Sequence, residues 1–231
     1  MIKTILWDID GTLLDFKAAE RAAIKTCFRL FGLGECTDEM VARYSAINET
    51  YWERLELGEL TKPQVLTGRF EEFLQREGIA FDGIDAFNGA YQIRLGDTIC
   101  YRDDSCALIR KLRGRVRQYA VTNGTVVAQE KKLRNSGLGE LFDGVFISDR
   151  VGFEKPAREF FDHVFAQIGP VDPAETMIVG DSLTGDIRGG NNAGIVTCWY
   201  NPAGLPNDRG VRVDREIRNL WEIESMLDEV V

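Results

Sequence analysis

Residues 4–12 read TILWDIDGT, so two aspartates, Asp8 and Asp10, stand at the end of an apolar run. The residues before them are typical of a strand buried on both faces, and Gly11 and Thr12 indicate a turn directly after it. Because alternate side chains of an extended segment share one side, we expect both carboxylates to reach one space. Two carboxylates there repel each other and lose hydration, which costs several kcal/mol unless a cation compensates. The pattern predicts a metal site that also supplies a nucleophile and an acid/base group.

The composition limits the classes of protein to which the chain can belong. Its 231 residues, 44% of them hydrophobic, suit one large domain or a core domain that carries an insertion. The 28 lysines and arginines are outnumbered by 37 aspartates and glutamates, which gives a net charge of −9. Nucleic-acid polymers bind mainly to basic surfaces, so we do not expect one as a partner. A small phosphorylated metabolite held in one local pocket remains compatible with this charge.

The sequence also predicts a compartment. Its five scattered cysteines form no C-x-x-C pair, which is typical of thiols in a reducing environment. Asp8 and Asp10 interrupt the first apolar stretch too early for a secretory signal, and no run is long enough to span a bilayer. We therefore expect a cytoplasmic protein with no membrane partner, and the sequence leaves both a monomer and a dimer open.

A long helical segment follows the first strand. Apolar residues at helical spacing predict four helices with no strand between them. These helices are expected over residues 17–30, 38–57, 63–78 and 86–95. We therefore predict that residues 16–96 form an all-α cap inserted into a second domain.

From residue 97 onward helices and strands alternate. Helices are expected over residues 103–112, 126–135, 156–168 and 216–229, and strands over residues 117–122, 144–148, 176–180 and 195–200. Such alternation predicts parallel strands joined by right-handed crossovers. With the first strand, over residues 4–9, we expect a five-stranded parallel sheet. The predicted fold class is α/β, with a Rossmann-like core formed by residues 1–15 and 97–231.

Polar side chains stand at the ends of three of the predicted strands. They are Asp8 with Asp10, Thr122 with Asn123, and Asp181. Ligands of open parallel sheets bind beyond the carboxyl ends of the strands, so we expect these groups to converge. The hydroxyl of Thr122, the amide of Asn123 and the backbone donors around Gly124 are suited to phosphate oxygens.

Two further charged residues fit the same site. Lys155 stands before a predicted helix, where the helix dipole disfavours a cation unless anions lie close by. Asp181 can complete an oxygen shell around Mg²⁺, which prefers one or two carboxylates together with water and a substrate phosphate. Asp186 is expected either to bind this ion through water or to orient Lys155.

These groups, in this order and with these spacings, resemble the motifs of the haloacid dehalogenase superfamily, and the resemblance covers essentially the whole chain. It implies that Asp8 is a nucleophile that forms an aspartyl-phosphate. It implies that Asp10 protonates the leaving oxygen and then activates water. Thr122 and Lys155 would bind the phosphoryl group. Asp8, the Asp10 carbonyl and Asp181 would hold Mg²⁺. Dehalogenases are expected to carry a non-acidic residue at position 10, so the resemblance implies a phosphatase.

Segments of the predicted cap, and two further segments of the predicted core, are similar to the non-canonical pyrimidine 5′-nucleotidase subgroup. The similarity lies in residues 47–52, 58–61, 68–71, 147–156 and 193–199. It implies a nucleoside 5′-monophosphate as substrate, which Tyr44, Tyr51 or Trp52 could stack against. Their spacing is equally compatible with packing inside the cap. The alternatives are a phosphatase of small acids or sugar phosphates, such as phosphoglycolate, a phosphomutase, and a binding protein of this fold without turnover.

Overall fold

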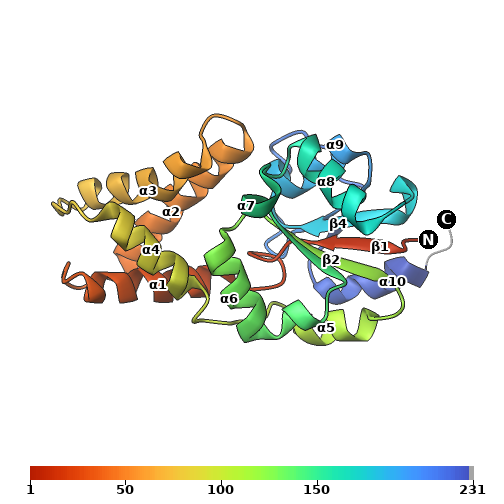
Figure 1. The fold of residues 1–231 in the computed structure, drawn as a ribbon, viewed down its shortest axis with the longest axis horizontal. Coiled ribbons are helices and arrows are strands. Elements are labelled where there is room, and N and C mark those ends of the chain that lie inside the picture. The colour runs from red at the N-terminus through yellow and green to blue at the C-terminus, as the bar shows by residue number, and fades with distance from the viewer. Residues whose placement is uncertain (229–231) are drawn as a thin grey trace.

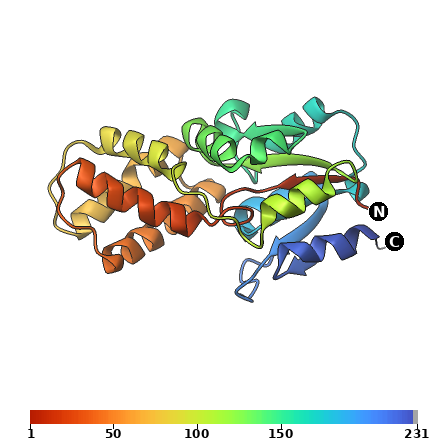
Figure 2. The same ribbon diagram turned by 90° about the horizontal axis from the view of Figure 1, so that it is seen from below.

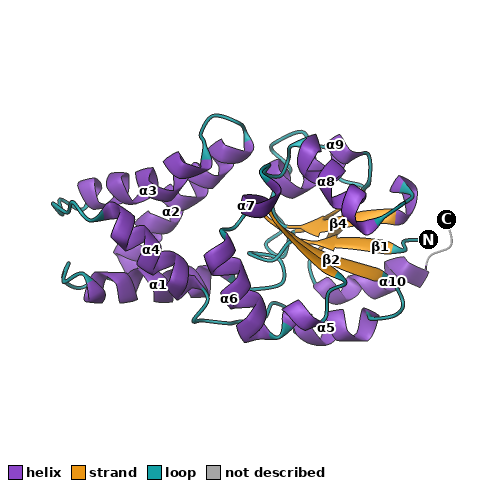
Figure 3. Cartoon of the chain, in the orientation of Figure 1, coloured by secondary structure: helices purple, strands orange, loops and turns teal. Residues whose placement is uncertain are grey.

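A computed structural model describes residues 1–228. Within this range the strands form one parallel sheet in the order β3-β2-β1-β4-β5-β6 (Figures 1 and 3). The strands are β1 (Thr4–Trp7), β2 (Arg117–Thr122), β3 (Gly144–Ile147), β4 (Thr176–Gly180), β5 (Val196–Tyr200) and β6 (Arg215–Ile217). β1 lies between β2 and β4, with Trp7 opposite Ala120 and Val179. The three strands that end in polar residues are therefore neighbours, as predicted.

The sixth strand corrects the prediction for the C-terminal segment. Residues 216–229 were expected to form one helix, because apolar residues recur there at helical spacing. Instead β6 pairs with β5, a short 3₁₀ turn follows, and helix α10 (Ile223–Asp228) begins only after it. Asn219 ends the strand segment, since its side chain accepts from Trp221 N and Glu222 binds back to its backbone. Residue 229 lies outside the described residues.

Helices cover both faces of the sheet, and each face has its own hydrophobic cluster. One face packs against α5 (Ser105–Leu112), α6 (Val126–Ser136) and α10, and the other against α8 (Arg158–Ile168) and α9 (Arg188–Ala193). The short helices α7 (Ser148–Val151) and α9 were not expected. α5 and α8 each begin two residues later than the sequence predicts, at Ser105 and Arg158. For α5 the reason is that Asp103 and Asp104 have φ values of 47° and 52°, which are not helical.

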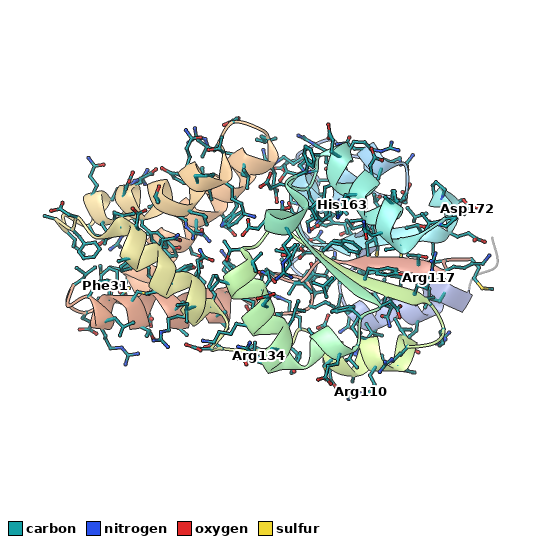
Figure 4. The ribbon with its side chains drawn as sticks, in the orientation of Figure 1. Phe31, Arg110, Arg117, Arg134, His163 and Asp172 are labelled. Atoms are coloured by element: carbon teal, nitrogen blue, oxygen red, sulfur yellow. The ribbon has the colours of Figure 1, made fainter. Side chains whose placement is uncertain are left out.

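The cap consists of α1 (Phe16–Leu30), α2 (Asp38–Glu56), α3 (Lys62–Arg76) and α4 (Ile84–Leu95), which lie together at one end of the molecule (Figure 1). Its core is an aromatic cluster in which Tyr44 stacks on Phe70 at 5.3 Å between ring centroids. Phe31, at the far end of the cap in Figure 4, contacts the rings of Phe81 and Phe87. No helix within residues 1–228 is long and apolar enough to cross a membrane.

Two neighbouring segments join the cap to the sheet (Figure 2). Asp15 N donates to the Cys100 carbonyl oxygen at 2.8 Å, and Arg102 N donates to the Leu13 carbonyl oxygen at 3.0 Å. The two connections are thus hydrogen-bonded to each other. These hydrogen bonds hold the two connecting segments side by side between the cap and the sheet.

Gly190 provides a test of how closely α9 packs on the sheet. A Cβ at this position would lie 2.6 Å from methyl carbons of Ile178 and Thr197, whereas a Cβ at the exposed Gly89 of α4 would meet nothing within 4 Å. We expect Gly190→Ala to lower the free energy of unfolding by about 1–3 kcal/mol through overpacking. Gly89→Ala should instead raise it by about 0.5–1 kcal/mol through helix propensity. Urea denaturation of both variants measures this, and equal effects would contradict the packing of α9.

Candidate active site

A buried ammonium group stands at the centre of the charged residues. Lys155 is 2% exposed. Its Nζ donates to Asp8 Oδ1 at 2.8 Å and to Asp186 Oδ1 at 2.6 Å. A third bond reaches the Val121 carbonyl oxygen at 2.9 Å. Burial by itself disfavours the ammonium, but the carboxylates of Asp186 and Asp8 outweigh it and raise the pKa of Lys155. The structure therefore joins the predicted nucleophile, the lysine and Asp186 in one contact.

Three carboxylates surround a space that suits a cation. One oxygen from each of Asp8, Asp181 and Asp186 lies within 4.8 Å of the others. Burial raises the pKa of Asp8 well above its usual range, although Lys155 opposes the shift. Desolvation by the surrounding protein and the charge of Asp186 raise the pKa of Asp181 to about 7, while its side chain stays exposed at the cavity. Among the described residues Asp8 Oδ2 is buried without a hydrogen-bond donor. Mutual repulsion and an unpartnered oxygen fit a divalent cation with oxygen ligands.

The turn after β1 brings the first strand against Asp181. Gly11 has a φ of +93°, and a Cβ there would lie 2.3 Å from Asp181 Oδ2. Thr12 follows, and its hydroxyl donates to Asp181 Oδ1 at 3.3 Å. Only glycine combines this backbone conformation with this close approach. The Gly11-Thr12 pair thus places Asp181 next to the end of β1.

The segment Thr122-Asn123-Gly124 lines the cavity beside Lys155, and its side chains also form contacts that the sequence does not predict. Asn123 Nδ2 donates to the Lys155 carbonyl oxygen at 2.8 Å, and Asn123 Oδ1 accepts from Lys155 N at 2.8 Å. The Asn123 amide therefore holds the backbone of Lys155 in place. Thr122 Oγ1 accepts from Gly124 N at 3.1 Å, which leaves its own proton free for another acceptor.

Asp10 lines the same cavity as Asp8, and its carboxylate is bound by side chains of α6. Its Oδ2 accepts from Gln129 Nε2 at 2.6 Å, and its Oδ1 accepts from Lys132 Nζ. β1 ends at Trp7, so the strand alternation on which the prediction rested stops before either aspartate. Both aspartates still line one cavity. The two carboxylates therefore share one cavity but have different hydrogen-bond partners.

A cavity of about 570 Å³ lies between the cap and the ends of the strands. Trp52 lines it, but Tyr44 is fully buried in the cap core and Tyr51 faces another surface cleft. Of these three residues, Trp52 is therefore the candidate for stacking on a substrate. The position of Tyr44 is explained by its packing inside the cap core. Further wall residues are contributed by the cap, the connections and the loops of the core: Phe16, Lys17, Asn48, Glu49, Glu53, Glu56, Arg102, Trp199, Leu205, Pro206, Asp208 and Arg209.

Two cap residues that the sequence analysis did not identify reach across to the core. Glu56, the last residue of α2, accepts from the hydroxyls of Ser182 and Thr184. Lys62, the first residue of α3, donates to Ser148 Oγ at 2.7 Å and forms an ion pair with Asp149. The two ends of the α2–α3 connection thus bind two separate parts of the core, the segment after β4 and helix α7. No local pattern marks these residues, because their partners lie more than sixty positions away.

A Rossmann-like sheet with carboxylates and a lysine at its strand ends, covered by a helical cap inserted after β1, defines a class of capped hydrolases. The comparison with known families agrees. The chain belongs to the haloacid dehalogenase-like hydrolase family, whose sequence profile matches residues 2–194.

Similar proteins extend over almost the whole chain. HAD-hydrolase YfnB of Bacillus subtilis is 38% identical over 98% of this chain and 95% of its own. Pyrimidine 5′-nucleotidase PynA of Streptococcus pneumoniae is 35% identical, and pyrimidine 5′-nucleotidase YjjG of Escherichia coli is 29% identical. PynA is covered over 95% of its length and YjjG over 96%. They match 98% and 96% of this chain, respectively.

The fold is also that of solved structures. A magnesium-bound crystal structure of YfnB superimposes with a TM-score of 0.92 at 38% identity, with 99% of each chain covered. L-2-haloacid dehalogenase from Xanthobacter autotrophicus has a TM-score of 0.78 at 18% identity over 100% of both chains, which shows the shared fold alone.

The Glu56 contact predicts how stability depends on pH in the metal-free protein. Burial raises the pKa of Glu56 to about 7, although Thr184 and Ser182 oppose the shift. Since the folded protein then holds a proton that the unfolded chain releases at a lower pH, stability falls as pH rises from about 4.5 to about 7. Over this pH range we expect the free energy of unfolding of Glu56→Gln to fall by about 1–2 kcal/mol less than that of the wild type. The difference is smaller than for a carboxyl fully shielded from water, because solvent at the cavity wall weakens the effect.

Thermal unfolding in EDTA between about pH 5 and pH 8 measures this contribution. The matched control is Glu49→Gln, because Glu49 also lies on α2 but forms an exposed ion pair with Lys17. An identical pH dependence in wild type and Glu56→Gln would contradict the expected role of this contact.

Proposed function

We propose that this protein hydrolyses phosphate monoesters through an aspartyl-phosphate on Asp8, and that Mg²⁺ is its cofactor. The observation that carries this proposal is the unpartnered Asp8 Oδ2, buried beside the Lys155 ammonium and the carboxylate of Asp181. A carboxylate without a donor on one oxygen is costly in a protein interior unless a ligand completes its surroundings. A phosphate ester and a divalent cation together would do so.

The first step forms a bond between a carboxylate oxygen of Asp8 and phosphorus, and breaks the bond between phosphorus and the ester oxygen. The electron pair of the broken bond goes to the leaving oxygen, which takes a proton from Asp10. The positive charge of Lys155 and the free hydroxyl proton of Thr122 stabilise the phosphoryl oxygens as their charge moves. Asn123 supports this step indirectly by fixing the backbone of Lys155.

The second step hydrolyses the acyl phosphate. Asp10, now a carboxylate, takes a proton from water as the water oxygen attacks phosphorus, and Asp8 is regenerated as inorganic phosphate forms. Asp8, Asp181 and the carbonyl of Asp10 would hold Mg²⁺, with Asp186 beside them and bonded to Lys155. The bound ion supplies positive charge that offsets the repulsion between phosphate and carboxylates.

We further propose that residues 16–96 act as a cap that selects the substrate, and that this substrate is a nucleoside 5′-monophosphate. A cavity of about 570 Å³ is of ordinary size for a small-molecule site. Trp52 gives its cap wall an aromatic face, and relatives PynA and YjjG are named pyrimidine 5′-nucleotidases. The interdomain movement described for YfnB supports a cap that opens to exchange substrate and product.

Asp8→Asn tests the nucleophile. We expect kcat for an aryl phosphate to fall at least about a thousandfold, because an amide cannot form the acyl phosphate. Asp172→Asn is the control, since Asp172 only caps a short turn at the end of the core remote from the cap (Figure 4). Release of inorganic phosphate measures both rates.

The same assay tests the metal. EDTA should abolish turnover of the wild type, and added Mg²⁺ should restore it. Unchanged turnover in Asp8→Asn would refute the covalent mechanism, and full activity in EDTA would refute the metal requirement.

Trp52→Leu tests the substrate class. If Trp52 stacks on a base, this change should raise KM for nucleoside monophosphates about tenfold, which corresponds to roughly 1.4 kcal/mol of stacking. KM for phosphoglycolate or for sugar phosphates should change little. Tyr51→Leu, one residue away but outside the cavity, is the matched control.

A panel of monophosphates compared by kcat/KM completes this test. Nucleotides at background level would defeat the nucleotide proposal. Sugar or acid phosphates would then be the substrates, as for the N-acylneuraminate-9-phosphatase of Mus musculus, which is 28% identical.

A further inference from the structure

We propose that Lys132 and Gln129 are positioning residues that hold Asp10 for its proton transfers, an inference that rests on the proposed phosphatase function. Both side chains are on α6, outside the predicted motifs. Each binds a different oxygen of the Asp10 carboxylate. They do not touch a substrate in the cavity, because Asp10 lines the cavity and they do not. Their effect on the reaction must therefore pass through Asp10.

Two donors fix the carboxylate more firmly than one. Gln129 Nε2 approaches Oδ2 at 2.6 Å, while the Lys132 ammonium forms an ion pair with Oδ1. Residues three apart on a helix lie on the same face, so α6 presents both donors to Asp10 together. With each oxygen attached to a separate point on one helix, rotation of the carboxylate would break at least one bond. A general acid must be oriented toward the atom that it protonates, and this arrangement supplies that orientation.

The burial of Lys132 supports a role beyond stability. Lys132 is 1% exposed, and its Nζ also lies 5.1 Å from the centroid of the Phe16 ring. Asp10 is its ion-pair partner in the described part of the chain. Removing a lysine from water is costly, and buried ion pairs contribute little net stability compared with apolar residues of similar volume. The lysine is therefore better explained by what it does to Asp10 than by the stability of α6.

Gln129 is held in place by the loop proposed to bind phosphate. Its Nε2 lies 2.1 Å from the point where a Cβ of Gly124 would be, so its side chain passes directly over the Gly124 backbone. Its Oε1 is buried and has no hydrogen-bond donor within residues 1–228. The amide thus gives up one hydrogen bond in this position while donating to Asp10. The absence of a Cβ at Gly124 is what gives Gln129 access to the aspartate.

The leaving group of the substrate provides a specific test. Departure of an alkoxide from a nucleotide or alkyl phosphate needs a proton from Asp10, whereas 2,4-dinitrophenolate leaves readily without one. In Lys132→Met and Gln129→Met we expect kcat/KM for the alkyl substrate to fall about tenfold to a hundredfold, part of the usual contribution of a general acid. For 2,4-dinitrophenyl phosphate, kcat/KM should change less than about threefold, since it reports only the phosphorylation step.

The second step gives an independent readout with the same aryl substrate. Attack of water also needs Asp10, so kcat and KM should fall together while kcat/KM is preserved. A burst of 2,4-dinitrophenolate should then precede the steady state, because the aspartyl-phosphate accumulates. Lys131→Met is the control, since this neighbouring lysine on α6 binds Asp97 and the Ile93 carbonyl oxygen instead of Asp10.

A double-mutant cycle distinguishes positioning from a structural effect. In an Asp10→Asn background, Lys132→Met should not alter the ratio of kcat/KM between the two substrates any further. An equal loss of kcat/KM for both substrates in Lys132→Met and in Gln129→Met would overturn the inference. An additive effect on the ratio in the double variant would also overturn it. A wild-type protein that hydrolyses neither substrate would instead refute the proposed function.

Discussion

The contact of Lys155 with Asp8 and Asp186 is the interaction on which the arrangement of the site depends. These residues come from the turn before α8, the end of β1 and the segment after β4, and a single buried ammonium brings them within hydrogen-bond distance. Without this cation, the carboxylates of Asp8, Asp181 and Asp186 would repel each other in surroundings that already raise the pKa values of Asp8 and Asp181. The same charge is suited to a phosphate. The Lys155 ammonium, which offsets the repulsion between the carboxylates in the folded protein, is therefore also suited to binding a phosphorylated substrate.

α6 is the second organising element, because it connects the sheet, the cap and the proposed acid/base group. Leu133 packs into the cluster beneath the sheet, while Ala128 packs into the cap core. Between them, Gln129 and Lys132 reach Asp10. Movement of the cap relative to the sheet would therefore act on the helix that orients Asp10. α6 thus links the cap to the carboxylate that we propose as the proton donor.

Much of the fold could be predicted from local pattern. Strand ends with polar groups, helices at regular apolar spacing and the inserted cap follow from periodicity and from turn residues. β6 could not be predicted, because the apolar residues there have helical spacing: Ile217, Leu220, Ile223 and Leu227. Arg215–Ile217 forms a strand because it pairs with the edge of β5. In the site, the sequence indicated which residue types matter. It did not show that the Asn123 amide is occupied by Lys155 or that Asp10 faces α6.

The sequence alone determined the class of sheet, the helical insertion and the identity of the charged groups, because these depend on residues close together in the chain. Only the tertiary structure decided which of those groups touch. Gln129, Lys132, Glu56 and Lys62 carry no local signal, since a lysine or glutamine on an amphipathic helix has the same pattern whether its face meets solvent or an aspartate 122 positions away. Contact between distant segments depends on the packing of whole elements, and packing is a property of the folded chain.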